Sequence, residues 1–222
     1  MKVHRAVYST TLVGVSVLTL VSSISACGKP SPSDGPTPTL TSPTADIDAT
    51  PLTILSVTGG KVLVMKPGET EWVSGVQGMT LGVDYKIKTQ SGGHAAVTFF
   101  EGSTIELEGS TEISLSELAL DGTASHIGIE QTLGKTVSRV QKLIDPESSY
   151  EVETVSAIAA VRGTEFYVSV TRSGTTTVGS TEGEVVVAAQ GVEVELAEGE
   201  RTTVSPGKPP GEPEPDVTER GK

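Results

Sequence analysis

The chain has 222 residues, and its 28 Asp and Glu residues outnumber its 16 Lys and Arg residues, which gives a formal net charge of -12. No basic cluster lies outside the N-terminus, so the composition argues against nucleic acid as a partner. Glycine is abundant at 25 residues, and aromatic residues make up only 4% of the chain. Because strands and turns are favoured over helices by this composition, we expect an all-β protein with a single domain.

The N-terminal segment has the order of an export signal: basic residues, an apolar run over 6–21, and then small residues. Cys27 is the only cysteine, so no disulfide can form within the chain. The sequence Ile-Ser-Ala-Cys that ends at Cys27 resembles the bacterial lipobox. The resemblance implies a lipoprotein signal peptide over 1–26, cleavage after Ala26 and a lipid anchor on Cys27. The alternative is an uncleaved helix that spans the membrane.

Two further segments lack the pattern of a folded domain. Residues 27–51 are rich in Pro, Ser and Thr, which is typical of a disordered, extended tether. Residues 206–222 are charged and interrupted by proline, which predicts a disordered tail. The β-domain is therefore expected over residues 52–205.

Within that domain, short segments of alternating polar and apolar residues are separated by glycine-containing turns, about every 8–12 residues. This spacing is typical of a sandwich, a barrel or a stacked β-coil, and it predicts about 13 short strands with hardly any helix. The predicted strands lie at 52–57, 61–65, 71–73, 78–81, 85–89, 94–100, 103–109, 111–115, 126–133, 150–155, 191–197 and 199–204, with further strands inside 157–187.

One segment, 135–144, fits two structures. Val137, Val140 and Leu143/Ile144 also have the spacing of one face of a short helix. We expect a strand or a loop there.

The stretch 157–187 has the clearest pattern in the chain. It predicts two strands joined by a Gly/Thr turn and a third strand after a Glu-Gly corner, with Phe166, Val168 and Val170 on one face of the middle strand. Gly163 stands where the first strand ends and the second begins, a place where a Cβ atom would be excluded by a close approach or an unusual backbone conformation.

Residues from about 55 to 205 resemble the FecR domain. The resemblance rests on a Gly-x-Val-x-Val opening, a lone tryptophan at Trp72, a Glu-Gly-Glu-Val hairpin at 182–185 and a central motif, which consists of Val161, Arg162, Gly163, Thr164, Glu165 and Phe166. It implies an extracytoplasmic all-β domain, either β-helix-like or a coiled sandwich. The best-known family members are transmembrane regulators that couple an outer-membrane siderophore receptor to a cytoplasmic sigma factor.

The motif residues have structural as well as functional interpretations. Arg162 is expected to cap carbonyl groups or to pair with a carboxylate beside the strand corner. Thr164 is expected to bond to the backbone at the turn. Trp72 fits an exposed anchor for an interaction, or a side chain packed over the first hairpin.

No motif predicts catalysis or a bound cofactor. His94 and His126 are far apart in the sequence, and without further cysteines they predict no metal site. The chain has no nucleophile elbow, Walker loop or dinucleotide-binding fingerprint, so we expect a protein that is not an enzyme.

Two functions therefore fit the sequence. The first is a lipid-anchored binding or sensing module on the extracytoplasmic face of a bacterial cell membrane, which recognises an envelope protein or a glycan and takes part in signalling. The alternative is a structural envelope lipoprotein that acts as a scaffold.

Overall fold

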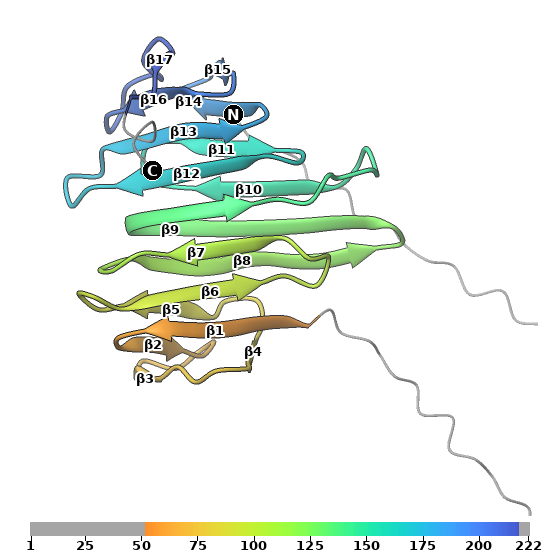
Figure 1. Cartoon of the computed structure of the whole chain (residues 1–222), viewed down its shortest axis with the longest axis vertical. Helices are drawn as coiled ribbons and strands as arrows, with labels where there is room; N and C mark the ends of the chain where they lie inside the picture. The colour runs from red at the N-terminus through yellow and green to blue at the C-terminus, as the bar shows by residue number, and fades with distance from the viewer. Residues whose placement is uncertain (1–51, 218–222) are drawn as a thin grey trace, which may run out of the picture. The chain divides into compact units, whose positions relative to one another are not determined.

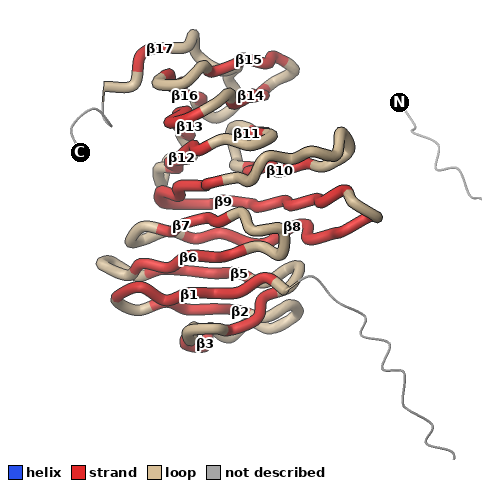
Figure 2. Tube along the Cα trace, turned by 45° about the vertical axis from the view of Figure 1, so that its right-hand side comes forward, coloured by secondary structure: helices blue, strands red, loops and turns tan. Residues whose placement is uncertain are grey.

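The computed structural model describes residues 52–217. The predicted signal peptide, its cleavage at Ala26, the lipid site at Cys27 and the tether lie outside the described residues, as do residues 218–222. Within the described part the chain consists only of strands and loops (Figure 2). None of its segments forms a helix long and apolar enough to cross a membrane.

The prediction of an all-β fold is confirmed, although the described residues form 17 strands where about 13 were expected (Figure 1). The additional strands include a fourth strand where the sequence predicted three within 157–187, and Glu214–Pro215 beyond the expected end of the domain. The strands are β1 (Thr53–Gly59), β2 (Val62–Met65), β3 (Val73–Ser74), β4 (Met79–Leu81), β5 (Lys86–Thr89), β6 (His94–Thr98), β7 (Thr104–Leu107), β8 (Glu112–Asp121), β9 (Ala124–Arg139), β10 (Ser149–Glu153), β11 (Ile158–Val161), β12 (Glu165–Val170), β13 (Thr176–Glu182), β14 (Val185–Ala189), β15 (Val192–Leu196), β16 (Glu200–Val204) and β17 (Glu214–Pro215).

The strands form two layers that share β9. Sheet A has the order β4-β1-β6-β7-β9-β12-β13-β16-β17. Sheet B has the order β3-β2-β5-β8-β9-β10-β11-β14-β15. Neighbouring strands are antiparallel except β9 and β10, which are parallel. The chain passes repeatedly from one sheet to the other, so the fold is the predicted coiled sandwich.

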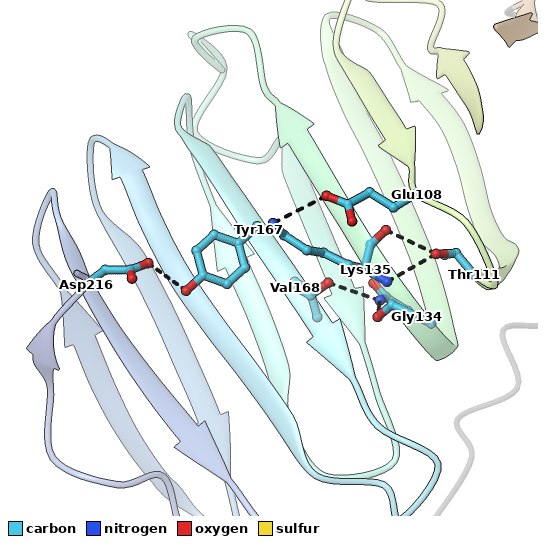
Figure 3. Close-up of polar contacts among 8 residues, drawn as sticks. Glu108, Thr111, Gly134, Lys135, Tyr167, Val168 and Asp216 are labelled. Atoms are coloured by element: carbon cyan, nitrogen blue, oxygen red, sulfur yellow. Dashed lines mark hydrogen bonds and ion pairs between the residues drawn. The ribbon is translucent and has the colours of Figure 1, made fainter. Parts of the chain in front are cut away.

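Strand β9 joins the two sheets because it bends near Gly134. Residues before the bend pair with β8 and β10, and residues after it pair with β7 and β12. Gly134 has a φ of +91°, and a Cβ atom there would lie 2.4 Å from the Cα of Thr111. The buried Gln131 donates hydrogen bonds to the carbonyls of Gly134 and Val168, and Thr111 bonds the backbone of Lys135 (Figure 3). These contacts satisfy polar groups that the bend removes from the ladder.

The core lies between the sheets and is built mainly from Val, Ile and Leu. As predicted, Phe166, Val168 and Val170 of β12 all point into it. Three buried rings meet near its centre: Tyr150 contacts Phe99 and Phe166 edge to face, with ring centroids 5.8 and 6.2 Å apart. The Tyr150 hydroxyl donates to the hydroxyl of Ser138, and burial raises the pKa of Tyr150 far above its ordinary value. Such edge-to-face pairs stabilise the core beyond their buried area.

The ambiguous segment 135–144 is a strand followed by a loop. It continues β9 as far as Arg139, and residues 140–148 then run as a loop to β10. The register of β9 on β7 and β12 explains the strand, because it pairs the backbone on both sides. A helix would leave those neighbouring strands without partners.

The ordered structure continues past residue 205, where the sequence predicted its end. Strand β17 pairs with β16, and the buried Asp216 accepts a hydrogen bond of 2.6 Å from the hydroxyl of Tyr167 (Figure 3). The ring of Tyr167 lies on Gly179, where a Cβ atom would come within 2.4 Å of it. Residues 206–217 therefore cover part of the outer surface of sheet A, and Tyr167 is buried on the face that alternation assigns to solvent.

Candidate functional site

The FecR-like motif lies at the corner where the chain crosses from sheet B to sheet A. Val161 ends β11, Phe166 belongs to β12, and both side chains are buried. The exposed Arg162 guanidinium donates hydrogen bonds to the carbonyl oxygens of Asp145 (2.7 Å) and Pro146 (2.9 Å). Arg162 thus caps two carbonyls of the loop between β9 and β10 and holds that loop against the corner.

Gly163 and Thr164 complete the contact between corner and loop. Gly163 has a φ of +125°, and an added Cβ would lie 2.9 Å from the Cα of Lys142. The Thr164 hydroxyl donates to the carbonyl of Glu184 at 2.9 Å, and the carbonyl of Thr164 accepts from the N–H of Val140. The corner therefore requires glycine at one position and a small hydroxyl at the next.

Beside this corner lies a cavity of about 460 Å³, here called the corner cavity. It is open to solvent and is lined by the loop 140–148, the turn between β6 and β7 and the hairpin of β8 and β9. The residues that give it chemical character are Glu101, Thr123, Gln141, Lys142, Ile144 and Asp145. Ile144 is 90% exposed, so the cavity has a large apolar side chain at its rim.

The two carboxylates of the corner cavity have different surroundings. Asp145 accepts hydrogen bonds from the Thr123 hydroxyl (2.5 Å) and from the N–H of Glu147 (3.0 Å). These bonds, together with the nearby charge of Arg162, lower the pKa of Asp145. Both oxygens of Glu101 are buried, and they accept no hydrogen bond from the described residues. A buried polar group in that situation costs free energy, so Glu101 is not explained by the stability of the fold.

Replacement of Asp145 by asparagine is expected to lower the melting temperature at neutral pH. Because folding lowers the pKa of Asp145, its ionised form stabilises the protein above the unfolded value, about pH 4, and this stability is lost as pH falls through the folded value. The gap between wild type and Asp145→Asn should therefore close under acid. Thermal unfolding of both proteins from about pH 7 down to about pH 2 would measure it. A gap that persists unchanged would contradict the assignment, and Asp121→Asn is the control.

The structure does not bring Trp72 to the corner. Trp72 is half-buried and directly precedes β3. Strand β3 lies at one end of the stack of strands, away from β11 and β12, which the corner joins (Figure 1). The ammonium of Lys88 lies 5.6 Å from the centre of the Trp72 ring and also pairs with Glu112 at 2.8 Å. Trp72 therefore packs against a neighbouring strand and leaves only part of its ring exposed.

No group of three or more potential metal ligands occurs among residues 52–217. His126 shares a hydrogen bond with the hydroxyl of Ser149, and His94 lies on another strand, in sheet A. The sequence interpretation did not single out Glu101, Ile144 or Asp145. No local signal in the sequence pointed to them, because a single exposed apolar side chain such as Ile144 is common on protein surfaces.

The two-sheet architecture and the corner define a β-sandwich in which the motif connects the layers. Residues 85–186 match the model of the FecR family, described as FecR protein. The predicted resemblance to the FecR domain is thus confirmed over these residues. None of the curated proteins compared with the chain matches it.

Two crystal structures of a proposed anti-sigma factor from Parabacteroides distasonis ATCC 8503, at 2.50 and 1.65 Å resolution, have a similar fold. In each case the TM-score is 0.50 and the sequence identity is 20%. The match covers 59% of this chain and 59% of the other chain. The likeness establishes a shared fold over that part.

Proposed function

We propose that this protein is a lipid-anchored sensing module of the bacterial envelope, which binds a protein partner through its FecR domain and takes part in signal transduction. The observation that carries the proposal is the FecR match over residues 85–186, which contains the corner and most of the surrounding sandwich. The similar fold of a proposed anti-sigma factor supports the same class of function.

The corner cavity supports a protein as the partner. Exposed apolar side chains beside well-packed structure are typical anchors of protein interfaces, and Ile144 is such a side chain. Arg162 holds the loop that carries it in a fixed position. Binding at Ile144 would therefore need little ordering of the loop, which reduces the entropic cost of association.

The lipid anchor on Cys27 is the second part of the proposal. An anchored domain samples a thin layer at the membrane, which raises its effective concentration toward a membrane partner. The predicted tether, 27–51, would set how far the domain reaches from the bilayer. The extracytoplasmic location follows from the export signal and the lipobox resemblance.

A site-specific cross-linking experiment tests the function. A photo-reactive amino acid is placed at position 144, in a chain with native Cys27 and in Cys27→Ala, and cross-linked products are identified from cells. We expect one membrane partner at position 144 of the anchored form and a large loss of that product in Cys27→Ala. The control is the same probe at Thr203, an exposed position on sheet A.

Two results would contradict the proposal. If position 144 gives no specific product in either form, the protein has no partner at the corner, and the scaffold function is favoured. If Cys27→Ala still fractionates with membranes and gives the same product, the lipid anchor is wrong.

A further inference from the structure

The outer face of sheet B carries an apolar stripe over its C-terminal strands. Ile158 and Ala160 of β11 lie directly opposite Ala188 and Val186 of β14. Ile158 is 38% exposed and Val186 39% exposed, so the stripe is open to solvent in the described structure. An exposed contiguous apolar surface of this kind marks a contact site more often than an isolated side chain does.

Carboxylates border the stripe on both sides. On β10, Glu153 and Glu151 lie opposite Ile158 and Ala160, and on β15 a second pair of glutamates lies opposite Ala188 and Val186. All four carboxylate side chains are exposed. The four residues, here called the acidic flanks, are Glu151, Glu153, Glu193 and Glu195.

The same face has two depressions, one over β8, β9 and β10 and one beside β11. Glu117, Glu151 and Glu153 line a depression of about 360 Å³ that also includes Gly128. A second depression, of about 260 Å³, lies between β11, β14 and β15. It is lined by Val186, Glu184 and Glu195, and at one end by the corner residues Arg162, Gly163 and Thr164. Long side chains of a bound segment would fit these depressions with their charged ends near the carboxylates.

Sheet A provides the contrast. Several of its outer carboxylates are paired: Arg139 contacts Glu106 and Glu165, and Arg201 contacts Glu214. No salt bridge within residues 52–217 involves the acidic flanks. Sheet A is thus largely neutralised and partly covered by residues 206–217, while the acidic charge of this part of sheet B has no partner within the described chain.

We propose that this face of sheet B binds an extended segment of a partner protein, with basic side chains on both sides of a short apolar run. Strands β11 and β14 separate the acidic flanks, which places the flanks about 14 Å apart at about 4.8 Å per strand. An extended chain advances about 3.4 Å per residue, so basic residues about four positions apart would reach both flanks. The apolar residues between them would cover Ile158 and Val186.

The negative charge of this face favours a basic partner segment over a second copy of the chain or an anionic membrane surface. A second copy of the same face would bring like charges together, which disfavours self-association through it. An anionic membrane surface would be repelled for the same reason. The inference names the chemistry of a partner segment and does not rest on the corner cavity.

The test uses the full-length chain in detergent and a synthetic peptide, acetyl-Lys-Arg-Val-Leu-Val-Lys-Arg-amide, with binding measured by calorimetry. Neutralisation of all four acidic flanks to glutamine should weaken binding by roughly tenfold or more, because opposite-charge contacts on both sides are lost. The Val186→Ser variant should also weaken binding. The matched control neutralises four exposed glutamates elsewhere, and these are Glu69, Glu71, Glu198 and Glu212.

Each outcome decides the proposal. Loss of binding in the flank variant but not in the control variant supports it, provided that thermal unfolding shows both variants folded. Equal losses would show attraction to net charge alone and would overturn it, as would no binding to wild type. Self-association abolished by Val186→Ser would assign the face to a second copy instead. Cross-linking at position 144 tests the proposed function separately, so failure of either proposal can be recognised without the other.

Discussion

Replacement of Phe166 by alanine is expected to lower the free energy of unfolding by about 3–5 kcal/mol, the usual cost of truncating a fully buried phenylalanine. Phe166 is 0% exposed, and its ring meets Tyr150 edge to face in the centre of the core. The backbone of β12 pairs on both sides, so the sheet cannot close the space that the ring leaves. Urea unfolding followed by circular dichroism would measure the loss from the midpoint and slope.

The half-buried Phe100 supplies the control for this measurement. It lies in the turn between β6 and β7 and packs only partly against the core. Phe100→Ala should cost clearly less than Phe166→Ala. If both variants lose the same free energy of unfolding, the buried aromatic cluster around Phe166 does not stabilise the protein more than the half-buried Phe100 does.

The second large effect is expected for Gly163→Ala. A φ of +125° is strained for any residue with a side chain, which costs about 1–3 kcal/mol, and the new Cβ would also lie 2.9 Å from the backbone of Lys142. The loop 140–148 would have to move away from the corner. Chemical denaturation is again the measurement, and loss of cross-linking at position 144 should accompany the loss of stability.

Gly122→Ala separates strain at the corner from the general effect of replacing glycine. Gly122 also has a positive φ, +61°, but an added Cβ would meet nothing within 4 Å. Its conformation is the left-handed one that other residues adopt at modest cost. If Gly122→Ala is as destabilising as Gly163→Ala, the close approach to Lys142 is not what selects glycine at the corner.

The strands were predictable because their signals are local. Alternation of Phe166, Val168 and Val170 reports one buried face, and glycine turns mark the ends of most strands. The bend of β9 was not predictable in this way. It depends on Gln131 and Thr111, whose contacts with the bend form only once the sheets are in place.

The ordered structure of residues 206–217 was also not predictable from local sequence signals. Their proline content argues against regular structure, and only tertiary contacts, the pairing of β17 with β16 and the bond between Tyr167 and Asp216, show that they lie on sheet A. Of the candidate site, the sequence located the motif and anticipated that Arg162 could cap carbonyls. It did not locate Ile144 or Glu101, because a cavity is formed by segments far apart in the chain and no local pattern reports it.

The bend in β9 also determines how the domain comes apart. In a stack of strands, the two halves could unfold independently of each other if each half had its own central strand. Here one strand supplies backbone partners to β7, β8, β10 and β12 at once. Removal of β9 would therefore open both layers together, and the sandwich should unfold in a single cooperative transition with its slowest-exchanging amides along this strand.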